Sequence, residues 1–510
     1  MQADVAIVGG GPVGLLLAAE LAGYGVDTVL LEARAEPSER PKATTLHARA
    51  VQSLARRGHL PPDASPYAGG SSPFHFAGLP GLVITAPPGE PEPVLKRPQV
   101  QLERHFERRA REAGATILRR HRVTGTGQDD DGVTVRAEGP QGPVTVTARY
   151  LVGADGARSA VREQAGIAAD THPATVAALA GTVRLREAGS LADGWHRTPR
   201  GWIVARTDAA GGTTHIRTLN CAAAHPDRRR EPTLEELRRE AAWIAGREIA
   251  MEDSRWLTRF SDFTRLARSF RAGRVLLVGD AAHVHFPIGG QGLSTGVQDA
   301  LNLGWKLALA VRGAAGEGLL DTYDAERRPA ARRVVDNTRA QLALMRPGPE
   351  PDSLREVFAG LLETDRDTGY LTGMISAQDT VLPARTGNSS PGEGTFLYNV
   401  ALATPTGGTD LVALLQDGRP LLLLLGEDDA DGGHLAEARE WAGLLQVVRA
   451  RATPDVPYAA LLVRPDGYVA WTPGGPGLGE ALRAYVRRSA GGRAAAAPAA
   501  EAAAGSGRLS

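Results

Sequence analysis

The 510-residue sequence contains a single cysteine, Cys221, and only three lysines. One thiol excludes an internal disulfide framework, a multi-cysteine zinc site, an iron–sulfur cluster and a catalytic dithiol. No apolar run approaches the roughly 20 residues that a membrane-spanning helix needs, and the N-terminus lacks the basic segment of a secretion signal. These absences lead us to expect a cytoplasmic α/β protein that does not act at a membrane.

The formal net charge is zero, because 58 lysines and arginines balance 58 aspartates and glutamates. A nucleic-acid-binding protein would carry a strong excess of positive charge. No nucleic-acid partner is therefore expected, and a homo-oligomer is compatible with this composition. At roughly 150 residues per domain, the length predicts about three domains.

The clearest motif is Gly9-x-Gly11-x-x-Gly14, which stands between a β-branched run and an apolar helical stretch. Gly9 permits a tight turn, Gly11 lets a pyrophosphate approach the backbone, and Gly14 lets helix and strand pack closely. Glu32 ends the next predicted strand, where a carboxylate would bind ribose hydroxyls. The competing interpretation is a turn that binds nothing, and the motif alone does not distinguish FAD from NAD.

Two further motifs follow predicted strands. The first contains Asp155 in Gly-Ala-Asp-Gly, and the second contains Asp280 and continues to Gly289-Gly290-Gln291-Gly292. Asp280 can accept a hydrogen bond from a ribose or ribityl hydroxyl, although an ordinary helix N-cap is the alternative. His283 and His285 are two residues apart without a third ligand, so no metal site is expected.

In this order and at these separations, the three motifs resemble those of the class A flavin-dependent aromatic hydroxylases, the p-hydroxybenzoate hydroxylase-like group. The sequence segment 283–292 is most similar to the corresponding segment of bacterial hydroxylases that act on angucycline, anthracycline and tetracycline polyketides. The resemblance implies an α/β fold with a Rossmann-like FAD-binding domain and a β-sheet substrate domain. Residues 461–471 resemble the end of a thioredoxin-like C-terminal domain, here without a CxxC motif.

The resemblance and the composition also divide the chain. The expected segments are an FAD-binding domain at 1–72, 95–170 and 271–390, the last with long helices, a substrate domain at 73–94 and 171–270, a thioredoxin-like domain at 391–489 and a disordered tail at 490–510. The two substrate-domain segments are expected to cover the reactive face of the flavin.

The resemblance implies that FAD is bound non-covalently. The positions that match the family's FAD-binding residues are Gly9, Gly11, Pro12, Gly14, Glu32, Lys42, Gln99, Asp155, Asp280, Gly290, Gly292 and Leu293. Lys42 stands where the family usually has an arginine, so the charge is kept but the bidentate fork is lost. Ser294 stands where many members have an asparagine.

The resemblance further implies a reaction. NADPH or NADH would reduce the flavin, O2 would add to give a C4a-hydroperoxyflavin, and a small aromatic substrate would be hydroxylated in antibiotic or secondary-metabolite biosynthesis. Pro287 is expected beside the reactive edge of the flavin. His215 and Arg217, on a predicted strand, are candidates to assist deprotonation of a phenol, while a hydrogen-bonded sheet histidine is the competing interpretation of His215.

Other functions share these motifs. A Baeyer–Villiger or drug-inactivating flavin monooxygenase would carry the same three signatures. A non-catalytic flavin-binding assembly component belongs to another class, and the intact segment from Pro287 to Gly292 argues against it.

Overall fold

The computed structural model describes residues 1–187, 189–208, 212–227, 230–364, 368–385, 387–426 and 433–487. The tail expected at 490–510 lies outside the described residues. No helix in the described ranges is long and apolar enough to cross a bilayer.

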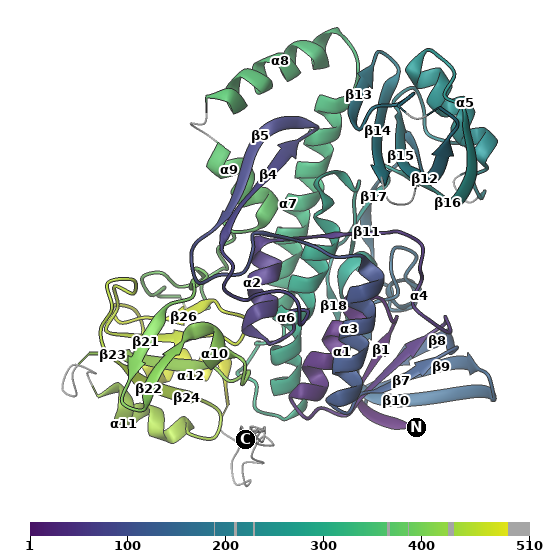
Figure 1. Ribbon diagram of the computed structural model, residues 1–510. Coiled ribbons are helices and arrows are strands. Elements are labelled where there is room, and N and C mark those ends of the chain that lie inside the picture. Colours follow the sequence, from purple (N-terminus) through teal and green to yellow (C-terminus); the bar gives the residue numbers. More distant parts are fainter. Residues whose placement is uncertain are drawn as a thin grey trace, which may run out of the picture.

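A large mixed sheet forms the base of the molecule, in the lower right of Figure 1. Five of its strands run parallel, so their carboxyl ends meet at one edge. In sheet order they are β19 (Val275–Leu277), β10 (Gly142–Gly153), β1 (Gln2–Val8), β2 (Thr28–Glu32) and β7 (Thr116–Arg119). Antiparallel strands complete the sheet, namely β18 (Arg271–Ala272), β9 (Val133–Gly139) and β8 (Arg122–Gln128).

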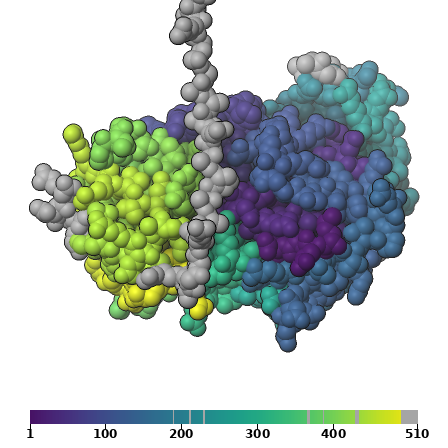
Figure 2. Space-filling view, turned by 90° about the horizontal axis from the view of Figure 1, so that it is seen from below, coloured from purple at the N-terminus to yellow at the C-terminus, as the bar shows by residue number. Residues whose placement is uncertain are grey.

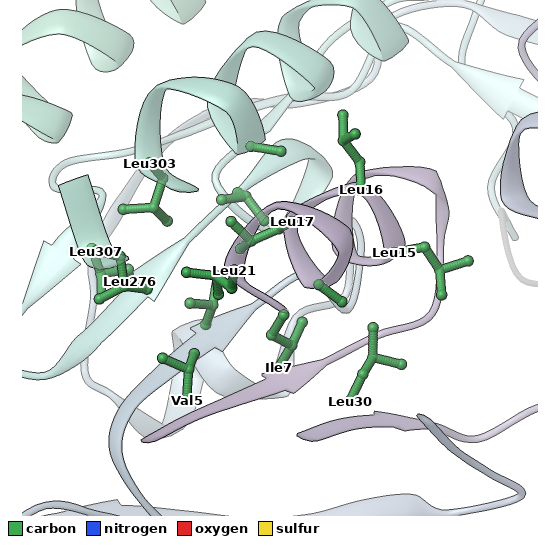
Figure 3. Close-up of a cluster of buried hydrophobic side chains, with 14 of the residues drawn as sticks. Val5, Ile7, Leu15, Leu16, Leu17, Leu21, Leu30, Leu276, Leu303 and Leu307 are labelled. Atoms are coloured by element: carbon green, nitrogen blue, oxygen red, sulfur yellow. The ribbon is translucent and has the colours of Figure 1, made fainter. Parts of the chain in front are cut away.

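Helix α1 (Pro12–Gly23) lies between this sheet and helix α6 (Gly292–Val311). Helix α3 (Gln99–Glu112) also packs against α1. Figure 3 shows Leu17 and Leu21 of α1 between Ile7 of β1 and Leu303 of α6. All residues of α1 from Leu15 to Ala22 are buried, because both faces of the helix are covered. This packing explains why α1 is apolar on nearly every side, with the ion-paired Glu20 as the exception, rather than amphipathic.

A second, antiparallel sheet has helix α5 (Leu234–Ala245) on one face. Its strands, in sheet order, are β13 (Gly194–Thr198), β14 (Gly201–Asp208), β15 (Thr213–Asn220), β12 (Ala177–Leu185) and β16 (Met251–Ser261). Ile216 packs in one core with Leu237 of α5. Because side chains alternate along a strand, His215, Arg217 and Leu219 lie on the face away from α5.

Smaller elements join the two sheets. The hairpin of β4 (Gly70–Phe76) and β5 (Leu79–Ala86) runs beside the helices that follow α6 (Figure 1). These helices are α7 (Thr322–Met345), α8 (Pro349–Glu363) and α9 (Thr368–Ser376). The remaining short elements are β3 (Thr45–His47), α2 (Ala48–Arg56), β6 (Val94–Lys96), α4 (Ala160–Gln164), β11 (Ala169–His172), β17 (Thr264–Ala267) and β20 (His283–Val284).

The C-terminal unit is the yellow-green lobe at the side of the N-terminal part in Figure 2. Its four-stranded sheet has the order β24 (Gln446–Ala450), β23 (Leu421–Leu425), β25 (Ala460–Val463), β26 (Val469–Trp471). The first pair is parallel and the other two pairs are antiparallel. In the sequence, helix α11 (His434–Ala438) lies between the parallel strands β23 and β24, and helix α12 (Leu478–Tyr485) follows the last strand, β26. This is the thioredoxin-like arrangement, completed by β21 (Ala401–Thr404), β22 (Gly407–Asp410) and α10 (Leu411–Leu415).

Candidate functional site

The three glycine-containing motifs meet at the carboxyl edge of the parallel sheet. A Cβ at Gly9 would clash with the carbonyl of Ala154, and one at Gly14 would clash with the carbonyl of Gly9. A Cβ at Gly279 would lie 3.3 Å from the Val13 side chain. The loops after β1, β10 and β19 are therefore packed against one another, and ligands of open α/β sheets bind at this edge.

Gly11 differs from its neighbours because a Cβ there would meet nothing within 4 Å. It caps α1 without any side-chain hydrogen bond, and Pro12 occupies the first turn of the helix. The first backbone N–H groups of a helix attract anions. The open space above Gly11 therefore fits a pyrophosphate.

Glu32 is held at the end of β2 by the backbone. Its carboxylate accepts hydrogen bonds from the N–H groups of Gly10, at 2.6 Å, and Arg34, at 2.8 Å. The side chain is half-buried beside the glycine loop. This placement fits the ribose-binding role expected from the sequence.

Asp155 carries an unused hydrogen-bond acceptor. Its Oδ2 accepts from the N–H groups of Ala160, at 2.7 Å, and Val161, at 3.2 Å, at the start of α4. Its Oδ1 is buried and has no hydrogen-bond partner among the residues that the structure describes. Buried polar atoms are rarely left unpaired in folded proteins, so this oxygen fits a hydroxyl of a bound cofactor.

Asp280 is exposed and has no hydrogen-bond partner among the described residues. Desolvation by the surrounding protein raises the pKa of its carboxyl, and the nearby His283 and Lys42 partly offset that increase. Lys42 is exposed, and the adjacent Ala43 carbonyl accepts from the Gln99 N–H at 3.1 Å. Lys42, Gln99 and Asp280 thus come together around the same edge of the sheet.

The segment after β20 turns toward that edge. Pro287 is exposed and precedes a short turn in which Gly289 and Gly290 have positive φ angles of 72° and 65°. Helix α6 begins at Gly292 with no side-chain cap, and Leu293 is buried. The free N–H groups of this helix start can face the polar edge of a flavin ring.

Asp299 fixes the loop that carries Asp280. It is fully buried and accepts from the Gly279 N–H at 3.1 Å, from His283 Nε2 at 2.7 Å and from Arg327 Nε at 2.9 Å. Although burial acts to raise the pKa of this carboxyl, His283 and Arg327 hold it below its usual value. His283 is thereby a structural residue.

His47 is a site residue for which the sequence gives no signal. Its Nε2 lies 2.7 Å from the Gly289 carbonyl, and its backbone N–H donates to Ser294 Oγ at 3.0 Å. Burial lowers the pKa of His47 to about 4. The ring is therefore neutral at pH 7 and donates through Nε2, and its buried Nδ1 has no partner in the described part of the chain.

The face of the second sheet that lies away from α5 contacts the segment before the turn at 289–291 through a pair of aromatic rings. Phe260 of β16 stacks on Phe286 with ring centroids 6.1 Å apart, and Leu219 of β15 belongs to the same core cluster. Arg217 is two residues further along the strand and His215 four. At roughly 3.3 Å per residue they lie about 7 and 13 Å beyond the Leu219 row.

The two candidate pocket residues have different environments. The His215 Nδ1 is 3.4 Å from Thr182 Oγ1, and burial together with the charge of Arg217 lowers the pKa of the imidazole to about 4. Arg217 makes no hydrogen bond or ion pair with a described residue, and burial lowers the pKa of its guanidinium. Arg217 thus keeps a free cationic group on this face and lies nearer the turn than His215 does.

Together, the parallel sheet, the open space at Gly11 and the unpaired oxygens of Asp155 and Asp280 fit the binding of a dinucleotide cofactor such as FAD. Residues 2–338 match the family described as "FAD binding domain", and residues 390–492 match "Aromatic-ring hydroxylase, C-terminal". The chain belongs to this family of FAD-dependent aromatic-ring hydroxylases and is a monooxygenase of class A.

Individual relatives are similar over nearly the whole chain. A 12-dehydrotetracycline 5-monooxygenase/anhydrotetracycline 6-monooxygenase of Streptomyces rimosus is 39% identical, over 95% of this chain and 99% of that protein. A rifampicin monooxygenase of Streptomyces venezuelae is 38% identical, over 92% and 95%. The solved structure of CabE, an aromatic hydroxylase from angucycline biosynthesis, is 35% identical with a TM-score of 0.85, over 95% and 99%.

Proposed function

We propose that this enzyme uses NADPH or NADH and O2 to hydroxylate a polycyclic aromatic polyketide in antibiotic or secondary-metabolite biosynthesis. The observation that carries the proposal is the 39% identity, over 95% of the chain, to a monooxygenase named for tetracycline intermediates. The face of the second sheet near the turn at 289–291 supports it, because that face carries aromatic side chains beside the free guanidinium of Arg217, and a planar phenol suits such a surface.

The proposed FAD site consists of the glycine loop, Glu32, Asp155 and Asp280, with Lys42 and Gln99 at its rim. When bound and reduced by the nicotinamide cofactor, FAD supplies the activated oxygen. One oxygen atom enters the ring as a hydroxyl group and the other leaves as water. The chain offers one dinucleotide-binding loop, so the nicotinamide cofactor would bind only transiently.

The protein's own contribution is orientation and charge. Pro287 lies at the exposed start of the turn, where it would line the reactive edge of the flavin. The free guanidinium of Arg217 would stabilise a phenolate oxygen, which makes the aromatic ring more nucleophilic. His215 remains a candidate for proton transfer, although its greater distance from the turn favours Arg217.

A second candidate function is oxidative inactivation of an aromatic drug, including insertion of oxygen next to a carbonyl. The observation that favours it is the 38% identity to a rifampicin monooxygenase. Both functions use the same cofactor, so only the product separates them.

The test is NAD(P)H oxidation by the purified holoenzyme under 18O2 with a panel of fused-ring phenols, including anhydrotetracycline, and with rifampicin. Stimulated oxidation and one labelled hydroxyl in a fused-ring product support the proposal. A labelled product from rifampicin alone supports the second function. Oxidation that yields only peroxide with every fused-ring phenol would contradict the proposed substrate class.

A further inference from the structure

The face of the second sheet that lies away from α5 is covered at one end and open at the other. Near the turn at 289–291, which faces the proposed flavin site, Trp202 and Leu219 are 3% and 5% exposed, because they pack in one core cluster with the β4–β5 hairpin and α7. One row further from the turn, Trp195 is 38% exposed and Arg217 is also exposed. A ligand on this face would therefore contact the outer rows of side chains.

Two arginines lie next to each other in the open part. Arg217 of β15 pairs with Val204 of β14, and the next pair on the same face joins Arg206 to His215. Arg206 and Arg217 are therefore diagonal neighbours, a relation in which Cβ atoms lie about 7–8 Å apart and long side chains can meet. Both are exposed, and neither makes a hydrogen bond or ion pair with a described residue. Asp208, two residues further along β14, pairs with neither of them.

The lack of a partner distinguishes these two arginines within the sheet. Several others pair with carboxylates, as Arg259 does with Glu236 at 2.6 Å and Arg197 does with Asp352. Desolvation lowers the pKa of the Arg217 guanidinium although the side chain is exposed, which indicates that it lies in a recess of the surface. Neighbouring cations repel each other, so an anion that binds beside them is favoured.

An indole ring lies at each edge of the sheet on the same face. Trp195 of β13 is level with Arg217, and Trp256 of β16 is level with His215. The His215 and Trp256 rings lie 5.5 Å apart, and Trp256 Nε1 donates to Thr182 Oγ1 at 2.8 Å, which fixes the indole. Aromatic rings pack against planar ligands, and guanidinium groups pair with oxyanions. The open part of this face therefore suits an aromatic acid.

We propose that the substrate is a fused-ring phenol that also carries a carboxylate, and that Arg206 determines specificity by binding this carboxylate beside the phenolate oxygen on Arg217. The inference rests on the proposed function, which supplies the phenol. The two carboxylate oxygens accept the parallel N–H bonds of the guanidinium fork. Because Arg206 lies one row further from the turn than Arg217, the carboxylate belongs to the end of the substrate that is remote from the flavin.

The test compares two ligands that differ in the anionic group alone. Rhein is a dihydroxyanthraquinone with a carboxylate, and aloe-emodin has a hydroxymethyl group in its place. The dissociation constants of both are measured by isothermal titration calorimetry on the wild-type holoenzyme and on Arg206→Gln and Arg206→Lys. Arg239→Gln is the matched control, because it removes the same charge from an exposed position of α5, on the opposite face of the sheet.

The expected results depend on the carboxylate. The wild-type holoenzyme should bind rhein about tenfold more tightly than aloe-emodin, as a charge-assisted pair at a partly exposed site would give. Arg206→Gln should abolish this preference and leave the Kd of aloe-emodin unchanged. Arg206→Lys should keep part of the preference, because lysine retains the charge but not the fork. Arg239→Gln should bind both ligands as the wild type does.

Three results would overturn the carboxylate site. The first is equal or undetectable binding of the two ligands by the wild type. The second is an equal loss of both ligands in Arg206→Gln, since Arg206 would then contact only the rings. The third is the same loss of rhein in Arg239→Gln, since the attraction would then be long-range. The proposed function fails separately: if Arg206 gives the preference for rhein but no fused-ring phenol gains a labelled hydroxyl, the carboxylate site stands and the hydroxylation does not.

Discussion

Asp155 and Asp280 lie at the same sheet edge but are prepared for binding in different ways. One carboxylate oxygen of Asp155 accepts hydrogen bonds at the start of α4, and the other is buried without a partner among the described residues. Neither carboxylate oxygen of Asp280 accepts a hydrogen bond from a described residue, and the side chain is exposed. Removing Asp280 should therefore affect mainly the cofactor, whereas removing Asp155 also affects the protein.

Asp280→Ala should lose FAD. A hydrogen bond to a charged group contributes about 1.5–3 kcal/mol, so we expect FAD to bind roughly 10- to 150-fold more weakly. The measurement is FAD content after purification and titration of the apoprotein by flavin fluorescence. Asp130→Ala is the control, because Asp130 is an exposed loop carboxylate. Full FAD occupancy in Asp280→Ala would refute the assignment.

Asp155→Ala should slow flavin reduction more than it weakens FAD binding. The change removes the unpaired Oδ1, and it also removes a helix cap whose loss costs about 1 kcal/mol of stability. Ser159→Ala controls for the cap, because Ser159 Oγ accepts from the Arg162 N–H at the start of the same helix. Anaerobic stopped-flow reduction by NADPH measures the effect. Equal reduction rates in the two variants would show that the unpaired oxygen has no role.

At the scale of elements, the sequence predicts helices, strands and turns that neighbouring residues encode, but it does not predict contacts between residues far apart in the chain. The strand, turn and helix around Gly9–Gly14 are encoded by neighbouring residues, and the structure has them where the pattern indicates. Helix α6 begins at Gly292, where the glycines at 289, 290 and 292 hide the beginning of the helical pattern. The His47 contact to Gly289 spans 242 residues, and no motif marks a single histidine for such a role.

The α1 loop gives a prediction in which two glycines behave differently. Gly11→Ala adds a methyl group in open space, so the protein should fold normally but bind FAD more weakly, because the methyl group occupies the pyrophosphate position. Gly14→Ala places a methyl group against the Gly9 carbonyl and should destabilise the fold itself. Urea unfolding of the apoproteins and FAD titration separate the two effects. Normal FAD affinity in folded Gly11→Ala would place the phosphates elsewhere.

The whole molecule should lose stability in mild acid. Burial lowers the pKa of His47, His75 and His285 to about 4. As the pH falls from about 6.5 toward 4, the unfolded chain takes up protons that the folded chain does not, so the free energy of unfolding decreases. For the fully buried His47 the decrease between pH 7 and pH 5 is about 2 kcal/mol. Urea unfolding at both pH values should show a smaller decrease in His47→Gln, and an unchanged decrease would contradict the neutral, buried assignment.

The C-terminal unit is attached to the catalytic part by a buried polar network rather than by apolar packing alone. Arg464, which precedes β26, pairs with Glu326 of α7 at 2.8 Å and with Asp466 at 2.6 Å. Glu326 also accepts from Lys306 of α6 at 2.7 Å. Helix α6 begins directly after the turn at 289–291 and joins this network through Lys306 in its second half. The thioredoxin-like unit therefore stabilises the helix that presents the turn, which gives it a role without any dithiol.

Arg464→Met tests this attachment. The substitution keeps most of the side-chain volume but leaves Glu326 and Asp466 buried with reduced compensation, and breaking a buried ion pair costs about 3–5 kcal/mol. The control is Arg451→Met, at an exposed arginine of the same unit. In urea, Arg464→Met should unfold at lower concentration, and hydrogen exchange should accelerate at the C-terminal end of α6 as well as in the C-terminal unit. If only the C-terminal unit becomes less protected, then it is a separate attachment, and α6 holds the flavin-facing turn without it.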